Sequence, residues 1–108
     1  MDNHDKEFIK LFVDNKNDLD INMKFDNGNT FLILATKLNE INIVKFLLEN
    51  GADINAQNLL MNTALHYATS RKHYNIVNLL IQHNANEEIK NKYGENPWEC
   101  LVAEKEEV

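Results

Sequence analysis

The 108-residue sequence has few of the residues that mark several common classes of protein. It holds one cysteine, Cys100, so no disulfide can form within the chain, which favours a reducing compartment. There is no apolar run of about 18 residues, and the first residues lack the basic and then apolar pattern of a signal peptide. We therefore expect a cytoplasmic protein without a membrane segment. A secreted effector that uses another export route would have the same features.

Arginine is almost absent, because Arg71 is the only one in the chain. The formal net charge is -6, and the acidic residues are spread along the sequence. Nucleic-acid binding rests on clustered Lys and Arg side chains, so we expect no nucleic-acid partner.

Patterns typical of catalysis and metal binding are also missing. The sequence has no glycine-rich phosphate loop and no Ser-His-Asp arrangement. His66 and His73 have no Cys or acidic residue at the tight spacing of a zinc site, and Cys100 has no nearby base. We therefore expect no enzyme activity, no cofactor and no metal, with chemistry at Cys100 or His66 only a formal alternative. We expect Cys100 and Trp98 to pack in the core.

What the sequence does contain is a repeat of 33 residues. Asn29-Thr30-Phe31-Leu32 recurs as Asn62-Thr63-Ala64-Leu65, and Asn42-Ile43-Val44 recurs as Asn75-Ile76-Val77. A capping Thr and an apolar face predict helices over 30–37 and 41–49, and again over 64–70 and 74–83. Gly51 ends the first copy in a left-handed conformation, and we expect Asn84 to do so in the second. Neither helix pair can bury its apolar face alone, so the copies must stack.

These residues resemble the ankyrin repeat, a helix-loop-helix-hairpin unit. Residues 25–57 carry Gly28, Thr30, Leu32 and Gly51-Ala52-Asp53-Ile54-Asn55 of its pattern, and residues 58–90 carry Thr63, Leu65-His66 and His73. The resemblance implies an all-α, ankyrin-repeat solenoid of stacked helix-turn-helix units with connecting β-hairpin loops. It also implies that His66 and His73 hydrogen-bond to backbone in neighbouring turns.

The repeat pattern predicts a single domain over residues 1–108. Asp20-Ile21-Asn22 lies 33 residues before Asp53-Ile54-Asn55, so residues 1–24 are interpreted as an N-terminal capping half-repeat. Two repeats follow, over 25–57 and 58–90. Residues 91–108 are interpreted as a C-terminal capping partial repeat with a last helix over 96–103 and an acidic tail that frays into solvent.

The resemblance further implies a non-catalytic module that binds another protein through its concave face and hairpin tips. The family's variable positions, carried across residue by residue, give the following candidate binding residues: Asp26, Asn27, Asn29, Lys37, Leu38, Leu59, Leu60, Asn62, Arg71, Lys92 and Tyr93. Gln57, Ser70, Lys90 and Glu95 occupy further positions of this kind.

The second hairpin tip departs most from the pattern. It reads Leu59-Leu60-Met61, where a polar pair and a glycine are usual, and Met61 lacks the conformational freedom of Gly28 and Gly94. Two interpretations stay open. The three apolar side chains either anchor a partner, or they belong to a hairpin that has changed shape and folds back onto its neighbours.

Two other functions remain as alternatives to a general binding module. The chain could be an inhibitory or regulatory subunit whose acidic charge imitates an anionic ligand, in which case its partner would be basic. It could instead form a homodimer through Leu59-Leu60-Met61 in an isologous contact, although we expect a monomer.

Overall fold

The computed structural model of the chain describes residues 3–15 and 19–100. It contains α1 (Asn3–Asp14), α2 (Phe31–Lys37), α3 (Ile41–Glu49), α4 (Ala64–Ser70) and α5 (Tyr74–Gln82), and residues 97–100 are also helical. The remainder of the helix predicted over 96–103, and the predicted acidic tail, lie outside the described residues. No strand occurs in the described ranges. The predicted all-α solenoid is confirmed.

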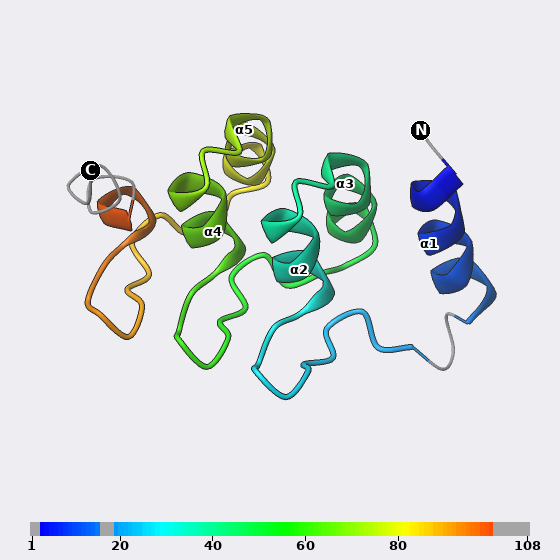
Figure 1. The fold of residues 1–108 in the computed structure, drawn as a ribbon, viewed down its shortest axis with the longest axis horizontal. Coiled ribbons are helices and arrows are strands. Elements are labelled where there is room, and N and C mark those ends of the chain that lie inside the picture. Colours follow the sequence, from blue (N-terminus) through cyan, green and yellow to red (C-terminus); the bar gives the residue numbers. More distant parts are fainter. Residues whose placement is uncertain (1–2, 16–18, 101–108) are drawn as a thin grey trace.

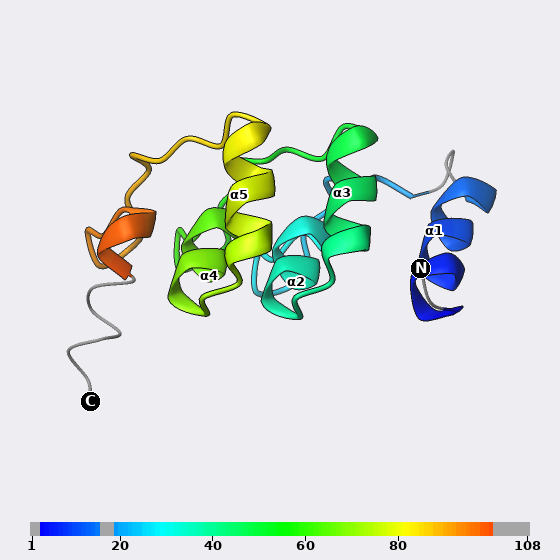
Figure 2. The ribbon, with the colours of Figure 1, turned by 90° about the horizontal axis from the view of Figure 1, so that it is seen from above.

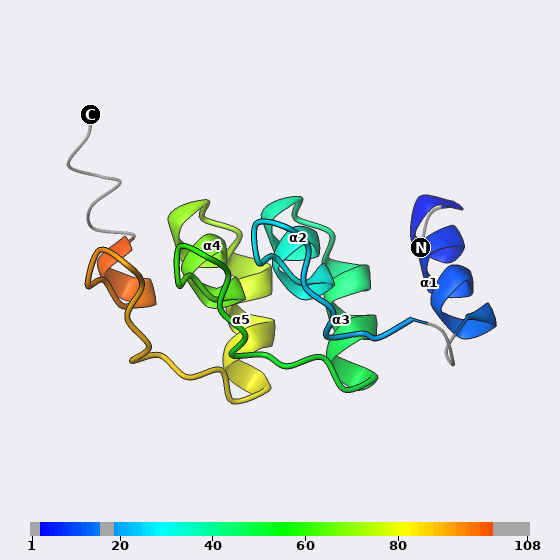
Figure 3. The same ribbon diagram turned by 90° about the horizontal axis from the view of Figure 1, so that it is seen from below.

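The helices form two rows. Helices α2 and α4 and the helical turn at 97–100 lie in an inner row, while α1, α3 and α5 lie side by side in an outer row (Figure 1, Figure 2). Each inner helix packs on the outer helix that follows it, and neighbours within a row also touch. The result is an elongated body of 44 × 26 × 24 Å. Three hairpins project beneath the inner row, as seen from below in Figure 3.

The core is made of apolar residues that recur at the repeat period. In each outer helix, apolar side chains spaced three and four residues apart face the inner row, which is the pattern of an amphipathic helix. The buried pairs are Leu32 and Leu65, Ile43 and Ile76, Val44 and Val77, and Leu47 and Leu80. Each such side chain contributes about 1.5–3 kcal/mol on full burial, so this shared core is a major source of stability.

Helix α1 is held to the stack by phenylalanines. Phe12 is buried, and its ring centroid lies 5.0 Å from that of Phe31 and 5.2 Å from that of Phe8. Phe31 begins α2 at the position where the family pattern has proline, and it also meets Phe25 edge to face at 5.2 Å. The loss of proline at this position is therefore accompanied by a packing role for the aromatic ring.

Hydrogen bonds between the hairpins fix their register along the stack. The Leu59 N–H donates to the Asn27 carbonyl oxygen at 3.1 Å, and the Lys92 N–H donates to the Leu60 carbonyl oxygen at 2.9 Å. At each of these two junctions, a pair of Asn side chains also joins the neighbouring hairpins. Asn58 Nδ2 donates to Asn29 Oδ1, and Asn91 Nδ2 donates to Asn62 Oδ1, both at 2.9 Å.

Each hairpin tip is closed by a residue with left-handed backbone. The three equivalent residues are Gly28 with φ 80°, Met61 with φ 61° and Gly94 with φ 78°. Met61 therefore adopts the turn conformation that glycine adopts in the other two tips, and the Met61 N–H donates to the Asn58 carbonyl oxygen at 2.8 Å. Asn84, with φ 65°, takes the left-handed role of Gly51, as predicted.

Alanine at Gly28 should destabilise the protein more than alanine at Gly94. A Cβ at Gly28 would lie 2.7 Å from the Leu59 nitrogen of the next hairpin, whereas a Cβ at Gly94 would meet nothing within 4 Å. Gly94→Ala should cost about 1–2 kcal/mol, the price of left-handed backbone for an L-residue, and Gly28→Ala should cost at least about 1 kcal/mol more for the backbone clash. Urea unfolding of the two variants measures the difference, and equal losses would contradict the close packing of the tips.

Candidate functional site

The predicted concave face corresponds to the exposed sides of α2 and α4 together with the three hairpin tips at 26–28, 59–61 and 92–94. We call this surface the inner face. One part of this surface lies on the inner helices, and the other part lies on the hairpin loops (Figure 3). Loops carried on a rigid scaffold are where proteins commonly keep their recognition residues.

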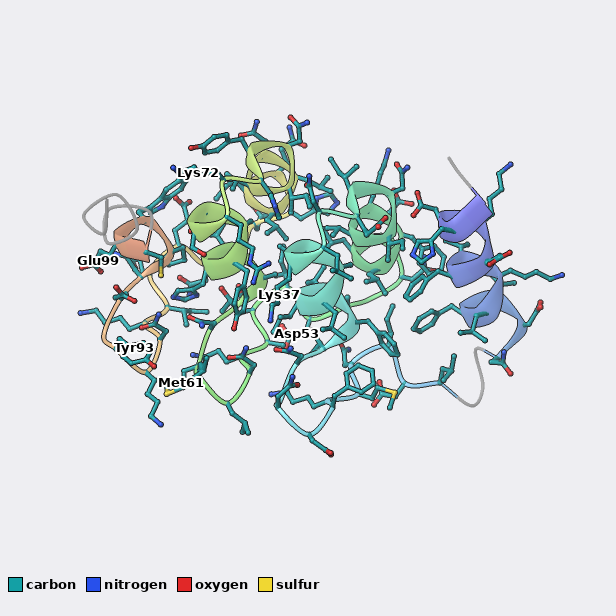
Figure 4. The ribbon with its side chains drawn as sticks, viewed as in Figure 1. Lys37, Asp53, Met61, Lys72, Tyr93 and Glu99 are labelled. Atoms are coloured by element: carbon teal, nitrogen blue, oxygen red, sulfur yellow. The ribbon has the colours of Figure 1, made fainter. Side chains whose placement is uncertain are left out.

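The apolar tip at Leu59-Leu60-Met61 faces solvent. The exposed fractions are 70% for Leu59, 41% for Leu60 and 47% for Met61. Tyr93 on the next tip is 71% exposed, and the two tips are neighbours in Figure 4 and joined by the bond between Lys92 and Leu60. Because Met61 keeps the turn conformation, the hairpin does not fold back over its leucines. The interpretation in which it changes shape and buries them is wrong.

The helical part of the inner face carries cations. Lys37 Nζ lies 4.9 Å from the centroid of the Tyr67 ring, so the end of α2 reaches over α4. Figure 4 places Lys37 between these two helices. Arg71 Nη1 donates to the Lys37 carbonyl oxygen at 3.4 Å, and Leu38 beside it is 70% exposed. The contacts of Lys37 with Tyr67 and of Arg71 with Lys37 join the surfaces of α2 and α4.

Sequence reasoning missed Tyr67. Its hydroxyl accepts hydrogen bonds from Asn58 Nδ2 at 2.8 Å and from Asn62 Nδ2 at 3.3 Å, so it joins the inner helix to the base of the hairpin. Its half-buried ring forms the floor under Lys37. The available signal was its place in the repeat. Tyr67 lies one period after Leu34, and both residues are half-buried on their inner helices.

Two of the candidate binding residues serve the stack instead of the surface. Asn29 is 2% exposed, and its side-chain oxygen accepts the hydrogen bond from Asn58. Its prediction as a surface residue for a partner is wrong, because the hairpins pack closely at that point. Asn62 is half-buried, and its amide is engaged with Asn91 and with Tyr67. Asp26, Asn27 and Lys92 remain exposed at the tips.

The predicted core role of Trp98 is also wrong. Leu32 and Leu65, at the equivalent positions, are each 1% exposed, whereas Trp98 is 40% exposed. The indole Nε1–H donates to Glu87 Oε1 at 3.0 Å. A ring of this size with a polar N–H fits a partly open position better than the closed space that a leucine fills.

His66 and His73 hydrogen-bond to the backbone of neighbouring segments. The Thr63 N–H donates to His66 Nδ1 at 3.0 Å, so the ring proton lies on Nε2, which donates to the Glu95 carbonyl oxygen at 2.9 Å. His73 Nδ1 lies 3.0 Å from the Thr36 carbonyl oxygen. The predicted hydrogen bonds of His66 and His73 to neighbouring turns are confirmed. Burial lowers the pKa of His66 below 6.5, although its bond to Glu95 and the Glu95 charge act in the opposite direction.

Cys100 is partly buried and poorly suited to nucleophilic chemistry. Burial, followed by the nearby Glu95 and Glu99 charges, raises the pKa of its thiol to about 11. The thiolate is the reactive form, so at neutral pH this cysteine is held as the thiol. Within residues 3–15 and 19–100, no group of three or more His, Cys, Asp and Glu side chains is placed to hold a metal ion.

Protonation of His66 should make stability depend on pH. The unfolded chain takes up this proton near pH 6.5, while the folded protein resists it until lower pH. The stabilising contribution is therefore complete above about pH 6.5 and is lost as the pH falls toward the lowered pKa, by at most about 1.4 kcal/mol per pH unit. Urea unfolding at about pH 7.5 and about pH 5.5 should show a smaller pH-dependent loss in His66→Asn than in the wild type or in His73→Asn. The same loss in all three proteins would argue against the buried neutral ring.

Comparison with known proteins agrees with this architecture. Residues 34–81 match the family model described as ankyrin repeats (many copies). No curated protein sequence matches the chain. In the described part of the chain, no helix has the length and hydropathy needed to cross a membrane. The matched residues run from within α2 to within α5, and they include α3 and α4 in full. From the repeat, the two rows of helices and this match, residues 34–81 are ankyrin repeats.

Proposed function

We propose that this chain is a non-catalytic module that binds another protein through its inner face, with Leu59, Leu60 and Tyr93 as apolar anchors. Ankyrin repeats are in general protein–protein interaction modules. The observation that carries the proposal is the exposed pair of leucines at the second hairpin tip, where the first tip has Asp26 and Asn27 and the third has Lys92 and Tyr93. Apolar anchors surrounded by polar side chains are typical of binding hot spots.

The leucines sit on a support that is already ordered. The turn bond from Met61 to Asn58 and the bond between Leu59 and Asn27 hold the tip in place. A partner that covers such a tip does not need to order it first, so less conformational entropy is lost on binding. Full burial of Leu59 would contribute about 1.5–3 kcal/mol to the complex.

The chemistry of the inner face also favours binding over catalysis. The buried polar side chains beneath it hydrogen-bond to backbone or to one another, as His66 and Asn58 do. Cys100, whose Sγ lies 3.8 Å from Glu95 Oε1, is held as a thiol at neutral pH. These features support a surface that recognises a partner without transforming it.

Replacing Leu59 and Leu60 by Asn should abolish partner binding without unfolding the protein. Both side chains are exposed, so the free energy of unfolding should change by less than about 1 kcal/mol. The wild type and the double variant are immobilised, partners are captured from native lysate of the source, and the stability of each is measured by thermal unfolding. Leu11→Asn on α1, where Leu11 is 53% exposed, is the matched control.

A partner retained by the wild type and by Leu11→Asn, but lost by Leu59→Asn/Leu60→Asn, supports the proposal. Retention by all three proteins would place the interface elsewhere. A wild-type mass that rises with concentration, and falls to that of a monomer in the double variant, would favour a homodimer instead.

A further inference from the structure

Charge is unevenly distributed between the two sides of the stack. The hairpins and inner helices, at residues 23–38, 56–72 and 89–100, contain six of the 11 Lys and Arg residues but three of the 17 Asp and Glu residues. The inner side is thus basic, although the net charge of the chain is -6. The outer helices and the connections that follow them carry most of the remaining acids, such as Asp53, which is labelled in Figure 4.

The cations of the inner face contact uncharged groups. Lys37 lies over the Tyr67 ring, and Arg71 donates to a backbone carbonyl. Lys92 is exposed beside Tyr93 at the third tip. An aromatic ring and a backbone carbonyl carry no net charge, so these contacts do not neutralise Lys37 and Arg71.

The three acids on this side are fewer than its six cations. Glu95 Oε1 accepts a hydrogen bond from Asn91 Nδ2 at 3.1 Å and lies 3.8 Å from Cys100 Sγ, so the carboxylate is turned into the third hairpin. Asp26 is exposed at the first tip, and Glu99 is exposed on the last helical turn. Lys37, Arg71 and Lys92 therefore lie on a side of the stack where positive charge exceeds negative charge.

We propose that the inner face binds an acidic segment of a partner protein, whose carboxylates pair with Lys37, Arg71 and Lys92 and whose apolar side chains contact Leu59, Leu60 and Tyr93. This inference rests on the proposed function and names the chemistry of its partner. Opposite charges across an interface speed association and select the partner, while the apolar contacts supply most of the affinity.

The same distribution argues against two other partners. A basic protein would meet like charges on the inner face, so the charge distribution favours an acidic partner there over the basic partner of an inhibitory subunit. A nucleic acid would find the cations, but it would also approach a strongly acidic molecule and leave the leucines without apolar contacts. An acidic segment with apolar residues uses both features of the surface.

The probe is a phage-displayed library of random peptides, selected on the immobilised full chain. Enriched peptides are synthesised with a fluorophore, and their Kd is measured by fluorescence anisotropy. We expect enriched sequences that combine several Asp or Glu residues with Leu, Ile or Phe. Lys37→Glu/Arg71→Glu should weaken their binding by about 10-fold or more, and raising the salt from about 50 to about 300 mM should weaken it further.

The matched control is Lys10→Glu/Lys45→Glu, which makes the same change of charge on exposed residues of α1 and α3. It should leave the Kd within about two-fold, because these residues lie on the outer row and their effect is screened over that distance. Circular dichroism confirms that each variant is folded. Lys90→Glu/Lys92→Glu, at exposed positions of the third hairpin, replaces Lys37→Glu/Arg71→Glu if that variant does not fold.

The proposal is overturned if no peptide is enriched, if the enriched peptides are neutral or basic, or if acidic peptides bind the inner and outer charge variants equally. Neutral peptides that Leu59→Asn/Leu60→Asn fails to bind would overturn only the acidic partner and would leave the proposed function standing. A fluorescent single-stranded DNA oligonucleotide is measured in parallel. Binding as tight as that of the peptides, and lost in Lys37→Glu/Arg71→Glu, would assign the basic face to a polyphosphate and overturn the proposal.

Discussion

The hydrogen bonds between successive hairpins are the interaction on which the candidate surface depends. A helix pair alone leaves its apolar face open, so stacking is required for the core, but stacking of leucines does not by itself fix where the hairpin tips lie. The amide pairs Asn58 with Asn29 and Asn91 with Asn62 do so, together with one backbone bond at each tip junction. Buried amides cost free energy unless paired, so each pair favours one register over its alternatives.

This arrangement separates stability from recognition. The apolar faces of the outer helices and the buried amides hold the stack, and the same side chains cannot also meet a partner. The residues proposed for recognition, namely the leucine tip, Tyr93 and the cations around Lys37, are ones that the stack positions but does not use. Two side chains of α4 also bind the backbone of the last hairpin and the turn after it. His66 Nε2 donates to the Glu95 carbonyl oxygen, and Thr69 Oγ1 donates to the Pro97 carbonyl oxygen at 2.6 Å. The third tip, which carries Tyr93, is thereby tied to the second copy.

The 33-residue period was enough to predict the helices, the stack and the left-handed role of Asn84, because each follows from local spacing and capping. The period could not predict contacts between side chains of different copies. Tyr67 as a hydrogen-bond acceptor for the hairpin, Phe31 within the phenylalanine cluster and the burial of Asn29 all depend on residues brought together by folding. The exposure of Trp98 likewise depends on contacts that the period does not specify, such as the hydrogen bond from its indole N–H to Glu87. The exposure of Leu59 and Leu60 could not be predicted from the sequence, because it depends on the backbone conformation of Met61.

Amide hydrogen exchange of the free protein, followed by NMR, tests most directly whether the tips form an ordered surface before any partner binds. The Leu59 and Lys92 amides are bonded to the preceding hairpin, whereas Asp26 occupies the same position in the first tip, which has no described hairpin before it. The Leu59 and Lys92 N–H groups should exchange at least about 10-fold more slowly than the Asp26 N–H. Exchange of all three at the rate of an unstructured peptide would contradict a preformed inner face.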